Sequence, residues 1–477
     1  VLGAAGGAIA YAATRGPSAA SKLAHAAAEA RAQAAAEAAA VRSTQAQLLA
    51  ALHVTPAAGA ANVPLDTGIT VSDSAGTVSS VKVTGSSGVV IPGAVAAATG
   101  AWHSSGGLAG STTYHVTATV TRDGTSVTNS SSFSTLTPAA VATASLFPTE
   151  GTTVGVGQPI VVRFERDITA AAAQKAIESR LVVAMTKPVP GGWYWFSAHE
   201  LHFRPKAFWP AHETVQVTGN LDGIDLGGGV WTAGSVLDTF AIGDARISYA
   251  NLQSELMTVS INGATIYSFP ISGGRPQYPT MDGMHIVLDR ETVVHMVSST
   301  VGIPVNSPNG YDEYVYDDVH ISDSGEYVHA APWSVGSQGV TNVSHGCVNL
   351  STPHAMTFYN FSRVGDVVEV TGSPRPAAVG DHGVMDWSGP AWSQWAPAKV
   401  ATLAASSVPS TTSTTPTTIS SNPVIVPTPP PAPPPTTAAP TTTAAPTTTT
   451  SKPQTTTTKP RTTTTTKAAA TTSTTKP

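Results

Sequence analysis

Cysteine is nearly absent from this chain, since Cys347 is the only one among 477 residues. A single thiol excludes an internal disulfide framework and a cysteine-rich zinc site. The sequence also lacks HExxH and comparable ligand spacings, so it predicts no catalytic metal and no cofactor. The lone cysteine does not fix the cellular compartment, because a large exported domain can fold without disulfides.

Charge and aromatic side chains are scarce as well. Charged residues make up 11% of the chain, aromatic residues make up 6%, and the formal net charge is −5. This composition lacks the basic surface of a nucleic-acid-binding protein, so no nucleic-acid partner is predicted. Glycine and proline are plentiful, at 42 and 37 residues. The balance favours about two to four strand-rich domains with some unfolded sequence.

No apolar run at the N-terminus is long enough to cross a bilayer. Residues 1–13 are apolar and small, and we expect a truncated signal or membrane-anchor remnant there, or else an alanine-rich helix start. Residues 21–53 are rich in Ala, Glu, Gln and Leu, the strongest helix formers. They predict a helical stalk, with a poorly packed single helix as the alternative.

Short alternating runs replace the helical pattern from about residue 57. The run "TTYHVTATVTRDGTSV" alternates on both sides of Asp123-Gly124, a hairpin turn pair, and predicts a small β-sandwich. A second strand-rich unit begins near residue 139 and includes Trp193, Trp195, Phe203 and Trp209, which we expect in its core or in packing between domains.

A third strand-rich unit begins near residue 242. The run "ELMTVSINGATIYSFPIS" predicts a hairpin that turns at Asn262-Gly263, and "RVGDVVEVTG" reads as a closing strand. A tryptophan-bearing segment follows it. From residue 406 onward the chain consists of Thr, Pro, Ser and Ala repeats, which cannot bury a core and are expected to be disordered or extended.

The cysteine stands in a setting that favours chemistry. His329 ends the strand-like "GEYVH", and His345 lies two residues before the thiol. Imidazole can remove a thiol proton, and Gly346 leaves the neighbouring backbone amides free to face an oxyanion. These residues suggest a Cys/His acyl-transfer site. The alternative is that Cys347 is a small buried hydrophobe.

The longer string "HAAPWSVGSQGVTNVSHGCVNLS" closely resembles the signature of L,D-transpeptidases with a YkuD-type catalytic domain. The resemblance extends to "STVGIPVNSPNGY" upstream and to "DWSGPAWSQW" downstream, and it points to the mycobacterial and actinobacterial branch. In that branch, immunoglobulin-like domains precede the catalytic domain and a short C-terminal subdomain packs on it. The implied fold is mainly β, with two immunoglobulin-like β-sandwiches before a β-rich catalytic domain.

The expected domain division follows from the sequence patterns described above together with this resemblance, which covers roughly residues 139–405. It comprises an anchor or signal remnant with a helical stalk (1–56), immunoglobulin-like domains 1 (57–138) and 2 (139–241), the catalytic domain (242–372), a Trp-rich C-terminal subdomain (373–405) and a disordered tail (406–477).

The resemblance also implies residue roles. Cys347 is expected to be the nucleophile and His329 the general base. The carbonyl of Ala330, where relatives often carry serine, would orient the imidazole. Further roles fall on oxyanion and pocket-shaping positions (Tyr311, Gly346, Ser344, His345) and on substrate-binding positions (Asn349, Trp333).

The implied reaction joins two peptidoglycan stem peptides by a 3→3 cross-link through a Cys347 thioester, with release of D-alanine. Carbapenem-type β-lactams are implied inhibitors, the cell-wall polymer an implied partner, and the cell envelope the implied location. Alternatives with the same site are an L,D-carboxypeptidase and an enzyme that anchors proteins to peptidoglycan. Two further alternatives are a non-catalytic wall-binding protein and a papain-like protease, of which the protease is less favoured.

Overall fold

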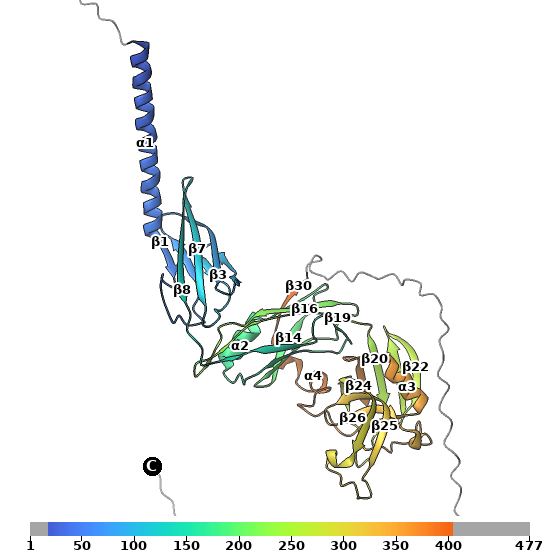
Figure 1. Cartoon of the computed structure of the whole chain (residues 1–477). Helices are drawn as coiled ribbons and strands as arrows, with labels where there is room; N and C mark the ends of the chain where they lie inside the picture. The colour runs from blue at the N-terminus through green and yellow to red at the C-terminus, as the bar shows by residue number, and fades with distance from the viewer. Residues whose placement is uncertain (1–17, 404–477) are drawn as a thin grey trace, which may run out of the picture. The chain divides into compact units, whose positions relative to one another are not determined.

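The computed structural model describes residues 18–403. It begins with α1 (Ala19–Ala51), whose first turn is capped by the Ser18 hydroxyl, 3.2 Å from the Ser21 amide. Only Leu48 of this helix is buried, so α1 packs near its C-terminal end, where it leads into β1 (Leu52–Thr55) (Figure 1). The helix predicted over residues 21–53 is confirmed.

Among the described helices, none has both the length and the apolar character that a membrane span requires. The anchor predicted at residues 1–13 and the tail predicted from residue 406 lie outside the described residues.

The first sandwich follows α1. One sheet has the order β1-β2-β6-β5 and the other β4-β3-β7-β8. Their remaining strands are β2 (Thr70–Asp73), β3 (Thr77–Gly85), β4 (Val90–Ile91), β5 (Gly93–Val95), β6 (Trp102–Ser104), β7 (Thr113–Arg122) and β8 (Thr125–Ser134). Asp123 and Gly124 join β7 to β8 with φ of 48° and 78°, so the predicted hairpin is confirmed.

Among the described residues, the second sandwich holds the largest buried apolar cluster, which includes Trp193, Phe203 and Trp209 as predicted, and the partly buried Trp195 packs against it. Its two main sheets have the orders β10-β12-β15-β14-β29 and β11-β19-β16-β13-β30, and a small third sheet is β17-β18-β9. Its elements before the third unit are β9 (Ala140–Ala142), β10 (Ala144–Phe147), β11 (Thr153–Val154), β12 (Ile160–Phe164), α2 (Ala171–Arg180), β13 (Val182–Met185), β14 (Gly191–Ser197), β15 (Glu200–Pro205), β16 (Thr214–Asn220), β17 (Asp225–Gly227), β18 (Val230–Thr232) and β19 (Ser235–Ile242).

The third unit pairs a five-stranded sheet, β22-β21-β20-β28-β23, with a four-stranded sheet, β24-β25-β26-β27. Apolar residues of both sheets and of α3 share one buried cluster. The elements are β20 (Arg246–Asn251), β21 (Leu256–Ile261), β22 (Ala264–Pro270), β23 (Gly283–Ile286), β24 (Asp289–Val297), β25 (Asp312–Ser322), β26 (Glu326–Ala330), β27 (Val348–Leu350), α3 (Thr352–Phe361) and β28 (Val367–Thr371). The hairpin predicted at Asn262-Gly263 joins β21 to β22.

The C-terminal segment packs differently from the expectation. Its α4 (Met385–Ser388) does contact the third unit, since the Met284 amide donates to the Ser388 hydroxyl at 2.7 Å. However, β29 (Ala396–Pro397) and β30 (Lys399–Thr402) add edge strands to the two main sheets of the second sandwich. The expected packing of this segment on the catalytic unit is therefore only part of its arrangement, because exposed edges of β14 and β13 also offer it backbone partners.

Candidate active site

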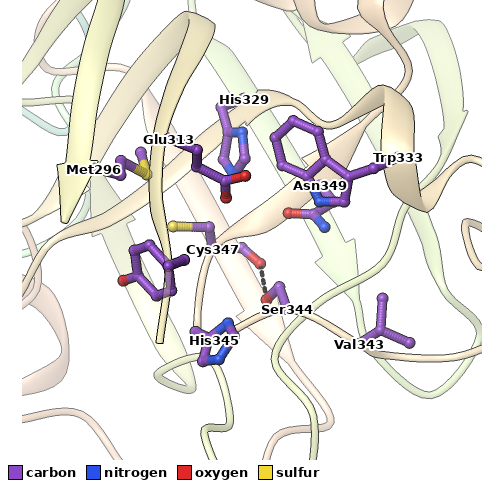
Figure 2. A pocket seen from close by; sticks show the side chains of 10 residues that line it. Met296, Glu313, His329, Trp333, Val343, Ser344, His345, Cys347 and Asn349 are labelled. Carbon is purple, nitrogen blue, oxygen red and sulfur yellow. Dashed lines mark hydrogen bonds between the residues drawn. The ribbon is translucent and has the colours of Figure 1, made fainter. Parts of the chain in front are cut away.

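Two strands that lie side by side bring the cysteine and the histidine together. β26 and β27 pair in parallel, with His329 beside Asn349, and Cys347 comes one residue before β27. Cys347 and Asn349 are two residues apart, so their side chains project to the same side of the strand. Both face a cavity of about 240 Å³ that His329 also lines. Figure 2 shows the sulfur, the imidazole and Asn349 around this space.

The remaining lining of this cavity mixes predicted and unpredicted side chains. Tyr311, Ser344, His345 and the exposed Trp333 were expected there. Sequence reasoning missed Met296, Glu313 and Val343. Glu313 stands two residues after Tyr311, so strand alternation from that tyrosine is the signal that could have found it.

The imidazole of His329 is buried and held in one tautomer. Its Nδ1 donates to the Ala330 carbonyl oxygen at 3.0 Å, which leaves Nε2 with a lone pair. Burial lowers the pKa of His329 to about 4, although the Ala330 hydrogen bond opposes that shift. The ring is therefore neutral at physiological pH and can accept a proton.

The thiol is protonated in the resting site. Desolvation raises the pKa of Cys347 to about 12; the Tyr327 amide opposes this, and carboxylates such as Glu326 and Asp318 raise it further. The sulfur lies 3.7 Å from the Gly325 carbonyl oxygen, and no hydrogen bond to His329 occurs among the described residues. The resting pair is thus a neutral thiol and a neutral imidazole, unlike sites that lower the thiol pKa.

Ser344 holds the backbone around the cysteine. Its hydroxyl donates to the Cys347 carbonyl oxygen at 2.6 Å and accepts from the Gly346 amide at 3.1 Å (Figure 2 shows the first bond). The Gly346 amide, one of those expected to face an oxyanion, is bonded to Ser344 in this structure, and the oxyanion role stays a prediction. Gly346 has a φ of +136°, which explains a glycine at this turn.

The other predicted residues take supporting places. The His345 ring lies 4.9 Å from that of Tyr311, and its Nε2 faces the guanidinium of Arg275. Desolvation raises the pKa of Tyr311 to about 12, so its hydroxyl keeps its proton and can donate. The buried Asn349 donates through Nδ2 to the Ser334 hydroxyl at 3.1 Å.

A second cavity reaches the same thiol. It has a volume of about 560 Å³ and shares Tyr311, His345 and Cys347 with the first. Glu326 and Arg375 line it and form an ion pair at 2.6 Å. Burial raises the pKa of Glu326 to about 7, and Arg375 opposes that shift. Two spaces therefore meet at one sulfur atom.

Comparison with known proteins identifies the family. A family described as "Bacterial Ig domain" matches residues 60–225, and one described as "L,D-transpeptidase catalytic domain" matches residues 245–370. L,D-transpeptidase 2 of Mycobacterium tuberculosis is 37% identical over 338 residues, which are 71% of this chain and 82% of that protein.

The chain belongs to the L,D-transpeptidase family of enzymes. L,D-transpeptidase 5 of Mycobacterium tuberculosis is 32% identical over 348 residues, 71% of this chain and 75% of that protein. Similar solved structures include an LD transpeptidase in complex with imipenem, with 36% identity, a TM-score of 0.42 and coverage of 48% of this chain and 98% of that one. The L,D-transpeptidase of Mycobacterium smegmatis gives 36% identity, a TM-score of 0.42 and coverage of 48% and 99%.

The predicted recognition and fold class are confirmed: this L,D-transpeptidase is mainly β, with immunoglobulin-like sandwiches before its catalytic domain. The domain boundaries given under Sequence analysis stay a prediction.

Proposed function

We propose that this L,D-transpeptidase forms 3→3 cross-links between peptidoglycan stem peptides through a thioester on Cys347. The observation that carries the proposal is that the Cys347 thiol and the His329 imidazole line the same cavity. The parallel pairing of β26 with β27 brings these two side chains together. Family membership supplies the substrate class, and the extracytoplasmic cell envelope follows as the place of action.

The first step breaks the bond between the third and fourth residues of a donor tetrapeptide. The thiol proton turns from the Gly325 carbonyl to Nε2 of His329 as the sulfur attacks the carbonyl carbon of the third residue. The imidazolium then protonates the departing D-alanine nitrogen, and a thioester remains. The hydroxyl of Tyr311, which stays protonated, would donate to the oxyanion.

The second step forms the cross-link. The side-chain amine of another stem's third residue attacks the thioester carbonyl, His329 removes its proton, and the thiol is released with that proton. Peptide exchange of this kind needs no ATP. The two cavities that meet at Cys347 support a reaction with two peptide substrates, since each offers room on one side of the sulfur.

The remaining side chains have positioning roles in this proposal. Ala330 would hold the tautomer of His329, and Ser344 would hold the turn that carries Cys347. Trp333 and Asn349 line the first cavity, and we assign them to substrate contact. Gly346 serves the turn itself.

β-Lactam inhibition is part of the proposal. A carbapenem presents a strained acyl group that the same thiol can open, which would leave a covalent adduct on Cys347. Intact-protein mass spectrometry after incubation with imipenem should show one adduct per chain on the wild type and none on Cys347→Ala.

The decisive experiment incubates the full chain with disaccharide-tetrapeptide and analyses the products by mass spectrometry. Cross-linked dimer and free D-alanine should appear together, and Cys347→Ala should yield neither. Tripeptide and D-alanine without dimer would show a carboxypeptidase instead. Transfer to a protein amine, with no dimer of stems, would show an anchoring enzyme.

A further inference from the structure

Two histidines converge on one carboxylate where the second sandwich meets the C-terminal segment. Nε2 of His202 lies 2.7 Å from Oε1 of Glu200, and Nε2 of His382 lies 2.8 Å from the same oxygen. The three atoms lie within 4.8 Å of one another. Glu200 and His202 alternate along β15, whereas His382 precedes α4. The cluster thus joins parts of the chain that are far apart in sequence.

The other nitrogen of each ring is held by its own carboxylate. Nδ1 of the buried His202 lies 2.8 Å from Oδ1 of Asp386, and Nδ1 of His382 bonds to Oδ2 of Asp323. Metal-binding histidines are commonly held in this way, because a carboxylate on one ring nitrogen fixes the tautomer and directs the other nitrogen at the metal. Both imidazoles here have that outer partner and turn Nε2 toward Glu200.

We propose that Glu200, His202 and His382 bind one Zn²⁺ ion, which links the second sandwich to the C-terminal segment. Two imidazoles and a carboxylate suit Zn²⁺, whereas Mg²⁺ and Ca²⁺ prefer oxygen ligands alone. The dication would take the place of the two protons that now lie between the imidazoles and Oε1 of Glu200. Tetrahedral Zn²⁺ sets its ligand atoms about 3.3 Å apart, so metal binding requires the Glu200 oxygen to move away from both imidazoles and the two Nε2 atoms to adopt the same spacing.

The charges around the cluster favour a cation. Glu200, Asp386 and Asp323 supply three carboxylates, and the only guanidinium that bonds to them among the described residues is that of the largely exposed Arg163, 3.4 Å from Oε2 of Glu200. In the metal-free cluster the two protonated imidazoles supply the balancing positive charge, and a dication with neutral imidazoles would supply the same charge in their place. A cavity of about 350 Å³, lined by both histidines, gives access and room for water as a fourth ligand.

The test measures zinc binding by the full chain. Cys347→Ala is used as the parent, because it removes the only thiol that could compete for the metal. After EDTA treatment and dialysis against Zn²⁺, inductively coupled plasma mass spectrometry should find one ion per chain, and chelator competition should give its affinity. Saturating Zn²⁺ should also raise the Tm.

Variants of the cluster separate this site from adventitious zinc. His382→Gln keeps a hydrogen-bonding side chain at a partly exposed position and should weaken zinc binding by at least about 100-fold. Asp323→Asn, which alters an outer partner, should weaken it by about 10–100-fold. His25→Ala, on the exposed face of α1, should change nothing. His202 is buried, so the test does not depend on its replacement.

Two results would overturn the proposal. One is a parent that binds no stoichiometric zinc, which would leave the cluster as a metal-free network of histidines and carboxylates. The other is zinc bound equally tightly by the parent and by His382→Gln. Because the readout is metal content and Tm, these outcomes do not depend on whether cross-linking activity is found.

Discussion

His329 lies directly beside Asn349 in the parallel pairing of β26 with β27, and Cys347 precedes Asn349 by two residues. His329 therefore lies on β26 and Cys347 lies directly before the paired strand β27, so the hydrogen bonds of this pairing constrain their relative position. A site built on paired strands holds its geometry better than one built on two loops.

Replacement of His329 should slow chemistry without unfolding the protein. We expect His329→Gln to lower the rate of Cys347 acylation by about 10²–10⁴-fold, the contribution of a positioned general base. Time-resolved intact mass spectrometry with imipenem measures that rate. His295→Gln is the matched control, because His295 pairs with Asp312 and does not line the cavity. A loss smaller than tenfold would exclude His329 as the base.

Alkylation of the thiol should report its raised pKa. Because the pKa of Cys347 is raised to about 12, the thiolate fraction should grow about tenfold per pH unit through the neutral and mildly alkaline range. The rate of iodoacetamide labelling should therefore still be rising at about pH 9, where a free cysteine with a pKa of about 8.5 approaches its plateau. A plateau below about pH 8 would show that the resting site holds a thiolate.

Gly346 should be needed for its backbone conformation. An added Cβ would lie 3.4 Å from Oε1 of Glu326, which is ordinary contact, but the φ of +136° is strained for any other residue. Gly346→Ala should therefore cost about 1–3 kcal/mol of stability. Thermal unfolding measures it, with Gly336→Ala as the control because nothing lies within 4 Å of an added Cβ there. Equal stability of the two variants would contradict the strain argument.

Trp395 should anchor the C-terminal segment. Its side chain is buried, and the guanidinium of Arg204 lies 4.7 Å from its ring centroid. Trp395→Ala should destabilise the protein by about 3–5 kcal/mol, as expected for loss of a large buried side chain. Trp333→Ala, at a site that is 55% exposed, should change stability by less than about 0.5 kcal/mol. Denaturant unfolding measures the free energy of unfolding of both variants. Similar losses of stability would show that Trp395 does not anchor the C-terminal segment.

The sequence predicted those parts of the fold that depend on residues adjacent in the chain, such as turns and helices. The turns at Asp123-Gly124 and Asn262-Gly263 were predictable because both positions need positive φ, which asparagine, aspartate and glycine tolerate. The helix α1 was predictable from its composition. The pairing of β29 and β30 with the second sandwich was not predictable, because the residue pattern of such short strands does not indicate which distant strand they pair with.

The site also has features that a local motif predicts and features that depend on rotamers or on residues far apart in the chain. Cys347 and His329 were predictable because a motif places them within one short segment. The hydrogen bond that removes the Gly346 amide from the cavity depends on the Ser344 rotamer, which no spacing reveals. The cluster around Glu200 was also hidden, because Asp386 lies 184 residues from its partner His202 and His382 lies 182 residues from its partner Glu200.

The return of β29 and β30 to the second sandwich imposes an order on biosynthesis. β13 and β14 gain their last edge partners from residues 396–402, which emerge only after the whole catalytic domain has been made. The second sandwich therefore cannot be completed while the catalytic domain is still being synthesised. A chain released early would keep two open sheet edges, which are sites for aggregation and for recognition by quality-control proteases.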